Sequence, residues 1–473
     1  MQVKIIDVVI IVLYLAFIAA VGIISQKKIK NSQDYYVAGR SLPTFMLVAT
    51  ICASVVGGSA LMGKGGYAYS GGVICIAIGL PYMIGMFIFS AFSGKISAVG
   101  QKYNFTSMSE MMGYRFGKPV KYISALLIAY TSIATVGAQI SATGTIISTI
   151  GGDKVSYLVG ALIATVIFIS YTASSGLFGV VYTDVVQFVV LIATVYIMLP
   201  IFGVSEVGGL EALIANTDPA KWNWNLSPEI ITLIVTNFIM TIAGAEFWQR
   251  AFAAKDRKTA FKGQFWGTAV YAVTIVITMV IGLCAALLLP TLIQDYGTAD
   301  YAIPVMIVKY LPIGLVGLTL AGMLSVMMSS ADTYLLVSAQ SVVSDVIKPN
   351  AKNMTDKKEL LISRLATVIF GVFAFVVAVF FTSAYDALMF GWTFYAATLG
   401  VPCLAAIVWK KATTAGVLSG MAVGFVSSIV WNLLGSPLGL GSTIVGVVLN
   451  AIVCVAVSLA TCKKYPSNVV ELN

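Results

Sequence analysis

Histidine is absent from this chain of 473 residues, and charged residues are scarce. Without imidazole, the chain lacks the usual side chain for proton transfer near neutral pH and for binding zinc. The six cysteines lie singly in apolar segments, without the spacing of a zinc or redox site, so we expect reduced packing residues. No HExxH motif or nucleophile–base motif is present either. We therefore predict that the protein is not an enzyme.

Long apolar runs dominate the sequence. Hydrophobic residues make up 59% of the chain and charged residues 10%, which predicts an all-α polytopic membrane protein of the cell membrane. The net charge of +9 comes from basic residues in short loops, so the lipid bilayer is an expected partner and nucleic acid is not. We expect about thirteen spans, at 4–26, 42–63, 72–97, 119–149, 153–172, 177–203, 226–252, 260–292, 302–346, 359–381, 384–409, 412–434 and 441–461.

The basic residues fall on one side of this thirteen-span arrangement. Every Lys and Arg is assigned to a loop of that side except Lys4, Lys64, Lys154, Lys221 and Lys309. Because cytoplasmic loops are enriched in Lys and Arg, we predict an external N-terminus and a cytoplasmic C-terminus.

Two spans contain sequences that are poor continuous helices. The first, from Ala53 to Gly66, includes five glycines within ten residues, and each costs up to about 1 kcal/mol relative to alanine in a helix interior. The second, from Ala243 to Trp248, follows five spans later. Glycine-interrupted segments at matching positions of two halves point to the binding site of an inverted-repeat transporter. Close helix packing through small residues is the alternative.

A polar run interrupts the apolar span 302–346: Ser329-Ser330-Ala331-Asp332-Thr333. A carboxylate near the centre of a membrane helix costs about 2.5–3.5 kcal/mol, so such groups usually face a cavity or an ion. All the donor atoms are oxygens, which suit a small hard cation such as sodium. Helix packing through small polar residues is again the alternative, and Asp332 favours the ion site.

Five motifs occur in order along the chain: Asp34–Ser41, Ser109–Glu110 with Tyr114–Gly117, Ser175–Leu177 with Tyr182–Gln187, Gln249–Arg250, and Ser329–Asp332. In order and spacing they resemble the sodium:solute symporters, a family that includes proline, sugar, sialic acid, pantothenate and choline transporters. The resemblance covers nearly the whole chain.

The resemblance implies an inverted-repeat, leucine-transporter-like fold that works by alternating access. Two five-helix repeats would be preceded by one leading helix and followed by two closing helices. The implied divisions are a leading helix with its cytoplasmic loop at 1–41, a first repeat at 42–203, an external loop at 204–225, a second repeat at 226–409, and the closing helices with a cytoplasmic tail at 410–473.

A sodium site is also implied by the resemblance. It would combine the backbone carbonyls of Ala53, Val56 and Val326 with the hydroxyls of Ser329 and Ser330. Neutral oxygens of this kind suit a monovalent ion and would bind a divalent one poorly.

Some members of the family hold a second sodium, and the matching positions here are Asp184, Ser329, Asp332 and Thr333. Asp332 departs from the hydroxyl of sugar-type members, although choline-type members also carry an acid. Two carboxylates would strengthen such a site. Alternatively, one aspartate stays protonated or pairs with a cation.

The substrate pocket is expected, by position in the family, between the two broken helices and two neighbouring helices. The candidate lining residues are Gly57, Ser59, Ala60, Gly63, Cys75, Tyr82, Gln139, Gly244, Glu246, Phe247 and Trp248. Ser59 stands where proline-type members have an aromatic residue and Gly244 where choline-type members have a tryptophan. An aromatic cage for a quaternary ammonium is therefore incomplete.

Lys64 and Glu246 each close one broken segment, and three interpretations of them remain open. They pair with each other as a latch on the gate or pocket. They clamp the carboxylate and ammonium of a zwitterion. Or Lys64 extends to the external interface with its charged end in water.

These features together predict a sodium-coupled symporter that imports a small polar organic solute, such as an amino acid, a sugar-like compound or an organic acid. Na⁺ and the solute are the expected ligands. Proton coupling through Asp184 or Asp332 is the nearest alternative and predicts uptake that persists without sodium and follows pH. A membrane sensor on the same fold is disfavoured, because the sequence ends soon after the last span.

Overall fold

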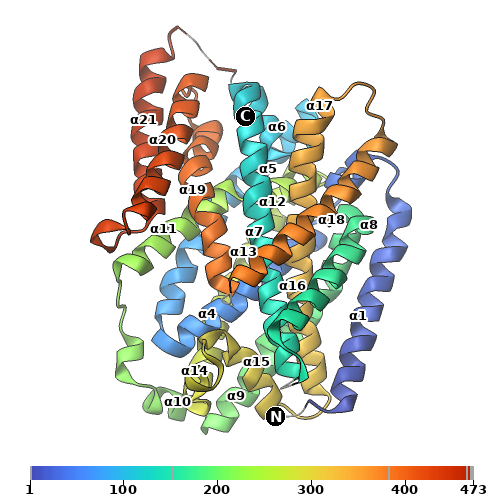
Figure 1. The fold of residues 1–473 in the computed structure, drawn as a ribbon, viewed down its shortest axis with the longest axis vertical. Helices are drawn as coiled ribbons and strands as arrows, with labels where there is room; N and C mark the ends of the chain where they lie inside the picture. Colours follow the sequence, from blue (N-terminus) through green and yellow to red (C-terminus); the bar gives the residue numbers. More distant parts are fainter. Residues whose placement is uncertain (1–2, 152–153, 382–383, 465–466, 469–473) are drawn as a thin grey trace.

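The computed structural model describes residues 3–151, 154–381, 384–464 and 467–468 (Figure 1). Seven side chains in these ranges lie outside the description, those of Ser59, Ala60, Tyr171, Ser174, Ser175, Ala384 and Tyr385. The described residues contain helices, turns and one isolated bridge between Leu42 and Ala254, with no strand. The predicted all-helical class is confirmed.

Helices follow one another along the whole chain. In the first half they are α1 (Ile5–Ser25), α2 (Ser32–Val37), α3 (Thr44–Val56), α4 (Gly58–Gly71), α5 (Ile74–Tyr103), α6 (Met108–Phe116), α7 (Lys118–Gly151), α8 (Tyr157–Leu191), α9 (Leu199–Val207) and α10 (Leu210–Asn216). In the second half they are α11 (Pro228–Ala243), α12 (Ala245–Ala253), α13 (Arg257–Leu288), α14 (Leu292–Tyr296), α15 (Ala302–Tyr310), α16 (Leu315–Ala339), α17 (Lys348–Asn350), α18 (Asp356–Phe380), α19 (Ala384–Val408), α20 (Thr414–Leu433) and α21 (Ser442–Thr461). Two π-helical segments continue α8 and α16, namely η4 (Ile192–Met198) and η7 (Gln340–Ile347). The 3₁₀ turns are η1 (Gln26–Lys28), η2 (Ala38–Arg40), η5 (Pro219–Trp222), η6 (Ala299–Tyr301) and η8 (Pro437–Gly439).

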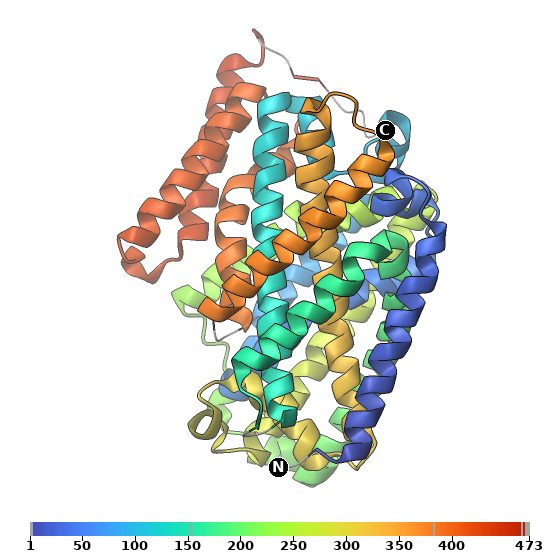
Figure 2. The same ribbon diagram turned by 45° about the vertical axis from the view of Figure 1, so that its right-hand side comes forward.

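Among the described residues, 11 helices are long and apolar enough to cross a membrane, or 12 if the bent pair α3–α4 is one span. A shorter apolar helix, Tyr157–Ser170, precedes a kink in α8 at Gly176, where φ is 54°. The start of α1 and the end of α21 lie at opposite ends of the long axis (Figures 1 and 2). A multi-pass membrane protein is therefore confirmed, while the number thirteen and the side of each terminus stay predictions.

Polar side chains fix where many helices begin. Each accepts a hydrogen bond from the backbone amide three residues later, as do Ser107, Ser227, Asp256, Thr355 and Thr413. A cap of this kind contributes about 1 kcal/mol. The Thr259 amide stabilises the charged form of the exposed Asp256 and so lowers the pKa of that carboxyl.

Helix α16 lies at the centre of the bundle (Figures 1 and 2). In its most apolar stretch 89% of the residues are buried, compared with 22% for α1 and 28% for α18 and α21. The predicted continuous span 302–346 is wrong in one respect, because α15 ends at Tyr310 and α16 begins at Leu315. Gly314, with φ at 88°, makes the turn between them.

The carboxylate of Asp7 ties α1 to the start of α16. Asp7 is 1% exposed and accepts hydrogen bonds from the amides of Gly314 (2.7 Å) and Gly317 (2.9 Å). Amides in the first turn of a helix lack partners within that helix and attract negative charge. A Cβ at Gly317 would lie 2.6 Å from the Asp7 backbone, so glycine permits this approach.

We predict that Asp7→Ala lowers the free energy of unfolding by about 2–3 kcal/mol, because a buried charge-assisted acceptor of two amides is lost. The thermal denaturation midpoint of the purified protein measures the effect. Asp7→Asn keeps an acceptor oxygen and should lose less. An Asp7→Ala protein that melts like the wild type would contradict this role.

Candidate functional site

One non-helical residue, Gly57 (φ 14°, ψ 137°), separates α3 from α4, and the two helices are bent by 53°. The last four carbonyls of a helix have no amide partner within it, and in α3 these belong to residues 53–56. The Ser330 hydroxyl of α16 donates to one of them, the Ser54 carbonyl, at 3.1 Å. The predicted break is confirmed, but as a single residue rather than an unwound stretch.

Glycine at this break lets α16 approach closely. A Cβ on Gly57 would lie 3.1 Å from Ser330 Oγ and 3.5 Å from Gln139 Nε2. A Cβ on Gly58 would lie 2.0 Å from Met327 Cγ, a distance that real Cβ atoms do not show. The elements that carry the five candidate sodium ligands are thus in contact, and all five are buried: Ala53, Val56, Val326, Ser329 and Ser330.

The second predicted break is also confirmed, at Gly244 between α11 and α12, where the backbone is extended. Two side chains bond the carbonyls that the break exposes. Trp248 Nε1 donates to the Ile242 carbonyl (2.9 Å), and the Tyr395 hydroxyl donates to the Ala243 carbonyl (2.5 Å). Trp248 is fully buried, so it packs the break in this structure.

Arg250, on α12, joins the two broken helices. The sequence analysis assigned it to a loop, which is wrong, because its side chain is 1% exposed. Its Nη2 donates to the hydroxyls of Thr333 (2.6 Å), Ser54 (2.9 Å) and Thr50 (3.2 Å). The guanidinium therefore reaches one of the candidate ligands of the second sodium.

Two buried carboxylates, Asp184 and Asp332, belong to the candidate ligands of the second sodium. Asp184 accepts a hydrogen bond from Thr50 and lies beside Ser329, whereas Asp332 accepts one from Thr172 of α8. Within the described residues, Asp184 Oδ1 and Asp332 Oδ2 have no close hydrogen-bond partner, and the Ser329 hydroxyl lies beside the Asp184 carboxylate. Buried polar atoms without partners are rare. These atoms mark where an ion or water would complete the contacts.

The structure divides the candidate ligands of the second sodium into two groups. Asp184 and Thr333 are linked through Thr50 and Arg250, with Ser329 alongside. Asp332 faces α8 instead, on another side of α16.

A small central cavity lies beside the first break. Its volume is ≈ 20 Å³, room for about one water molecule, so an organic solute does not fit in this conformation. The lining residues are Ser54, Val55, Gly57, Tyr82, Thr135, Gln139, Tyr334, Leu388 and Trp392.

Three candidate substrate residues, Gly57, Tyr82 and Gln139, line this cavity. Glu246 adjoins it, because its carboxylate accepts from the lining residue Tyr334 at 3.0 Å. The other candidates with described side chains are buried outside the lining, namely Gly63, Cys75, Gly244, Phe247 and Trp248. The side chains of Ser59 and Ala60 lie outside the described residues. Sequence reasoning missed Tyr334 and Trp392, which follow no local glycine signal.

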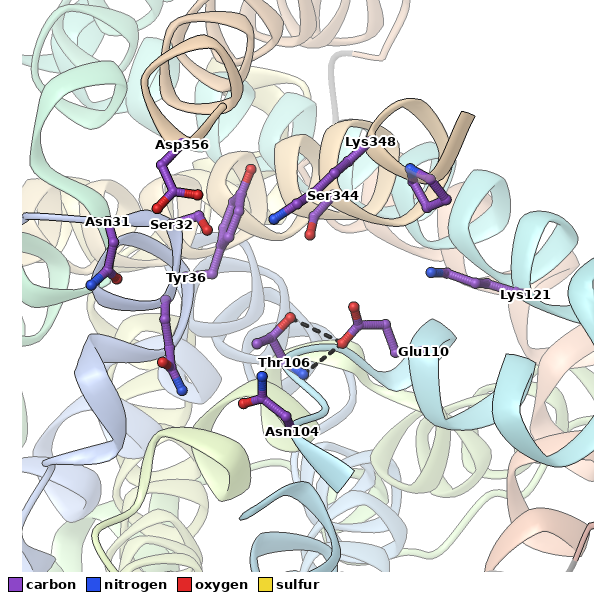
Figure 3. A pocket seen from close by; sticks show the side chains of 12 residues that line it. Asn31, Ser32, Tyr36, Asn104, Thr106, Glu110, Lys121, Ser344, Lys348 and Asp356 are labelled. Carbon is purple, nitrogen blue, oxygen red and sulfur yellow. Dashed lines mark hydrogen bonds between the residues drawn. The ribbon is translucent and has the colours of Figure 1, made fainter. Parts of the chain in front are cut away.

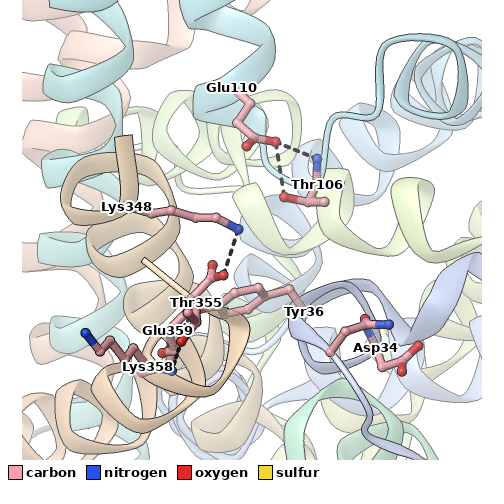
Figure 4. A network of polar contacts seen from close by, with 10 residues as sticks. Asp34, Tyr36, Thr106, Glu110, Lys348, Thr355, Lys358 and Glu359 are labelled. Atoms are coloured by element: carbon pink, nitrogen blue, oxygen red, sulfur yellow. Dashed lines mark hydrogen bonds and ion pairs between the residues drawn. The ribbon is translucent and has the colours of Figure 1, made fainter. Parts of the chain in front are cut away.

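Lys64 is 6% exposed, so the interpretation that its charged end reaches water at the interface is wrong for this conformation. Its ammonium donates to the Tyr271 hydroxyl. The ion pair found among the described residues is elsewhere, between Lys348 and Glu359 at 2.7 Å (Figure 4). Lys64 and Glu246 thus have separate partners.

A larger pocket of ≈ 580 Å³ lies between α2, α6, η7, α17 and the start of α18. Figure 3 shows Glu110, Lys121 and Lys348 pointing toward the same space. The pocket is lined by Asn31, Ser32, Gln33, Tyr36, Asn104, Thr106, Glu110, Lys121, Ser344, Lys348, Pro349 and Asp356.

Side-chain hydrogen bonds connect the wall of this pocket with Arg250, which contacts the hydroxyls beside the candidate ion sites. Arg250 Nη1 donates to Gln249 (3.3 Å), and Gln249 donates to Gln340 (3.0 Å). Gln340 in turn donates to the carbonyl of Thr106 (2.8 Å), which lines the pocket. An unbroken chain of hydrogen bonds therefore joins Arg250 to the wall of this pocket.

Comparisons with known proteins identify a family, similar sequences and a similar fold. A model described as the sodium:solute symporter family matches residues 35–424. The sodium/pantothenate symporter of Haemophilus influenzae is 25% identical over 454 residues, covering 90% of this chain and 90% of that protein. The sodium/myo-inositol cotransporter 2 of Rattus norvegicus is 24% identical, covering 90% and 69%. The solved structure of a Na⁺-coupled sialic acid symporter, substrate-bound and outward-open, has a TM-score of 0.85 at 18% identity and covers 98% of this chain and 99% of its own, which shows a shared fold.

We predict that Tyr395→Phe destabilises the second break, because the buried Ala243 carbonyl loses its donor at a cost of about 1–3 kcal/mol. A lower denaturation midpoint would show this. Tyr130→Phe is the matched control, since Tyr130 donates to a carbonyl at 3.4 Å in an exposed position. Equal effects of the two substitutions would contradict the assigned role.

Proposed function

Because the chain belongs to the sodium:solute symporter family, and so is a multi-pass membrane transporter rather than an enzyme, we propose that it couples sodium entry to the import of a small polar organic solute. The observation that carries this proposal is the contact of α16 with the break at Gly57, where the Ser330 hydroxyl donates to the Ser54 carbonyl and the Ser329 hydroxyl is fully buried. Carbonyl and hydroxyl oxygens, in a site without histidine or thiolate, suit an alkali cation.

The coupling ion would bind the carbonyls of Ala53, Val56 and Val326 and the hydroxyls of Ser329 and Ser330. Two features support this set. The carbonyls of Ala53 and Val56 lie in the last turn of α3, the part of a helix whose carbonyls lack amide partners within that helix. The Ser329 hydroxyl is fully buried, and the hydroxyl of the next residue, Ser330, already contacts the last turn of α3.

A second sodium at Asp184, Ser329, Asp332 and Thr333 is less well supported by the contacts. Arg250 already supplies a positive charge to the Thr333 hydroxyl, and Asp332 faces away toward Thr172. A second ion would require Arg250 to withdraw. We therefore propose one sodium per cycle for this arrangement. At about 100 mV and a tenfold gradient, one ion supplies about 3.7 kcal/mol, enough to concentrate a neutral solute about 500-fold.

Transport would proceed by alternating access between two inverted repeats, 42–203 and 226–409, with 1–41, 204–225 and 410–473 as flanking parts. The single-residue breaks at Gly57 and Gly244, one in each proposed repeat, support this division. The polar chain from Arg250 to Thr106 would be the closed gate toward a cytoplasmic C-terminal end.

The solute would occupy the cavity beside Gly57 after it widens. Tyr82, Gln139 and Trp392 line that cavity and would have to move. The similar proteins do not decide the class of solute, because pantothenate and sialic acid carry a carboxylate and myo-inositol is uncharged.

We predict that NaCl raises the denaturation midpoint of the purified protein relative to KCl at equal ionic strength. An ion that binds the folded state at 100 times its Kd adds about 2.7 kcal/mol of stability. The variant Ser329→Ala/Ser330→Ala should lose this sodium-specific difference. Ser325→Ala is the matched control, because Ser325 is equally buried one turn earlier on α16 and its hydroxyl donates to the Ala321 carbonyl of its own helix.

Equal melting in sodium and potassium would overturn sodium coupling. A midpoint that then follows pH in both salts would make proton coupling through Asp184 or Asp332 the better account. Loss of the sodium response in Ser325→Ala as well would show a general defect of α16 and remove support for the ligand assignment.

A further inference from the structure

Lys64 is a buried cation without an anionic partner. It lies on α4, seven residues after the first break, and is 6% exposed. Its ammonium contacts two phenols: it donates to the Tyr271 hydroxyl and lies 4.8 Å and 5.7 Å from the ring centroids of Tyr271 and Tyr82. Among the described residues, no carboxylate forms an ion pair with it.

An ammonium in such a place needs an explanation. Burying an unpaired charge is unfavourable by several kcal/mol, and a phenol dipole offsets only part of that. A purely structural role would be better served by an apolar side chain of similar volume. Ionisable groups at membrane depth mark ligand pathways for this reason.

Glu246, the acid of the second broken segment, does not form an ion pair with Lys64. Glu246 is buried on α12 and accepts from the Tyr334 hydroxyl at 3.0 Å. Tyr334 and Tyr82 both line the central cavity, and the ammonium contacts Tyr82. The positive and the negative group therefore bond different tyrosines, and they form no ion pair among the described residues.

Tyr82 lies between Lys64 and the central cavity. Its ring stacks on Trp392, with centroids 5.9 Å apart and planes 8° apart, and both residues line the cavity. It also contacts the ring of Tyr271, the partner of Lys64, at 5.7 Å. A side-chain movement of Tyr82 would therefore join the cavity to the space beside the ammonium.

We propose that Lys64 binds the anionic group of the transported solute and that this group is a carboxylate. The inference rests on the proposed function and narrows its solute to organic acids and zwitterions. The ammonium would exchange its neutral phenol partner for an anion, and the hydroxyls of Tyr271 and Tyr82 would donate to the carboxylate oxygens. Charge-assisted hydrogen bonds of this type are about twice as strong as neutral ones.

The test compares carboxylates with uncharged partners of nearly the same shape. The purified full chain is melted in sodium sulfate with pantothenate or pantothenol, N-acetylneuraminate or its methyl ester, and lactate or lactamide. We expect at least one carboxylate to raise the midpoint with an apparent affinity at least about tenfold above that of its partner. Chloride without any solute is a separate arm, because an inorganic anion shares the same chemistry.

Variants then assign the effect to Lys64. Lys64→Met should abolish the carboxylate response, yet leave the ligand-free midpoint unchanged or higher, because an unpaired buried charge is removed. Lys64→Arg should keep part of the response. Lys221→Met is the matched control, since Lys221 also lies over a tyrosine ring, at 5.4 Å from Tyr69, but donates to a backbone carbonyl. Its carboxylate response should match the wild type.

Several results would overturn the inference. They are a carboxylate response that survives Lys64→Met, uncharged partners that stabilise equally well, no response to any carboxylate, and Lys64-dependent stabilisation by chloride alone. Potassium sulfate separates this inference from the proposed function. A carboxylate response that needs Lys64 but is equal in potassium keeps the inference and removes sodium coupling. An uncharged solute that stabilises the protein only in sodium would remove this inference and keep sodium coupling.

Discussion

The hydrocarbon core of a membrane offers no water to backbone groups, so every break in a spanning helix must find new hydrogen-bond partners. The two breaks meet this constraint differently. At Gly244, side chains supply the donors, from Trp248 and Tyr395. At Gly57, the Ser330 hydroxyl supplies a donor to the Ser54 carbonyl, and the break lies against α16. We infer that the second break is completed by protein and the first by an ion.

Helix α16 contacts both broken helices. Ser330 contacts the first break, Thr333 contacts Arg250 beside the second, and Asp332 contacts α8. A shift of either broken helix therefore changes contacts on the same central helix. Each hydrogen bond in the chain from Arg250 to Thr106 contributes about 0.5–1.5 kcal/mol. Opening the three side-chain contacts therefore costs about 1.5–4.5 kcal/mol, the same order as the roughly 3.7 kcal/mol that one sodium supplies.

Local patterns in the sequence predicted the helices and both breaks, because apolar length and glycine content act within a few residues. The turn at Gly314 was missed although Leu311-Pro312-Ile313-Gly314 carries a turn signal. Arg250 was placed in a loop, because counting basic residues near helix ends does not see the hydroxyls that bury it. The Thr172 partner of Asp332 comes from 160 positions away and follows no pattern in either segment.

Equilibrium binding of radioactive sodium to the purified protein tests the central claim without knowledge of the solute. The account predicts saturable binding that unlabelled sodium displaces and potassium does not. Ser330→Ala should weaken it at least about tenfold, whereas Tyr395→Phe should leave the affinity of the folded fraction unchanged. Binding that survives Ser330→Ala, or that Tyr395→Phe weakens equally, would contradict the assignment of the ion to the break at Gly57.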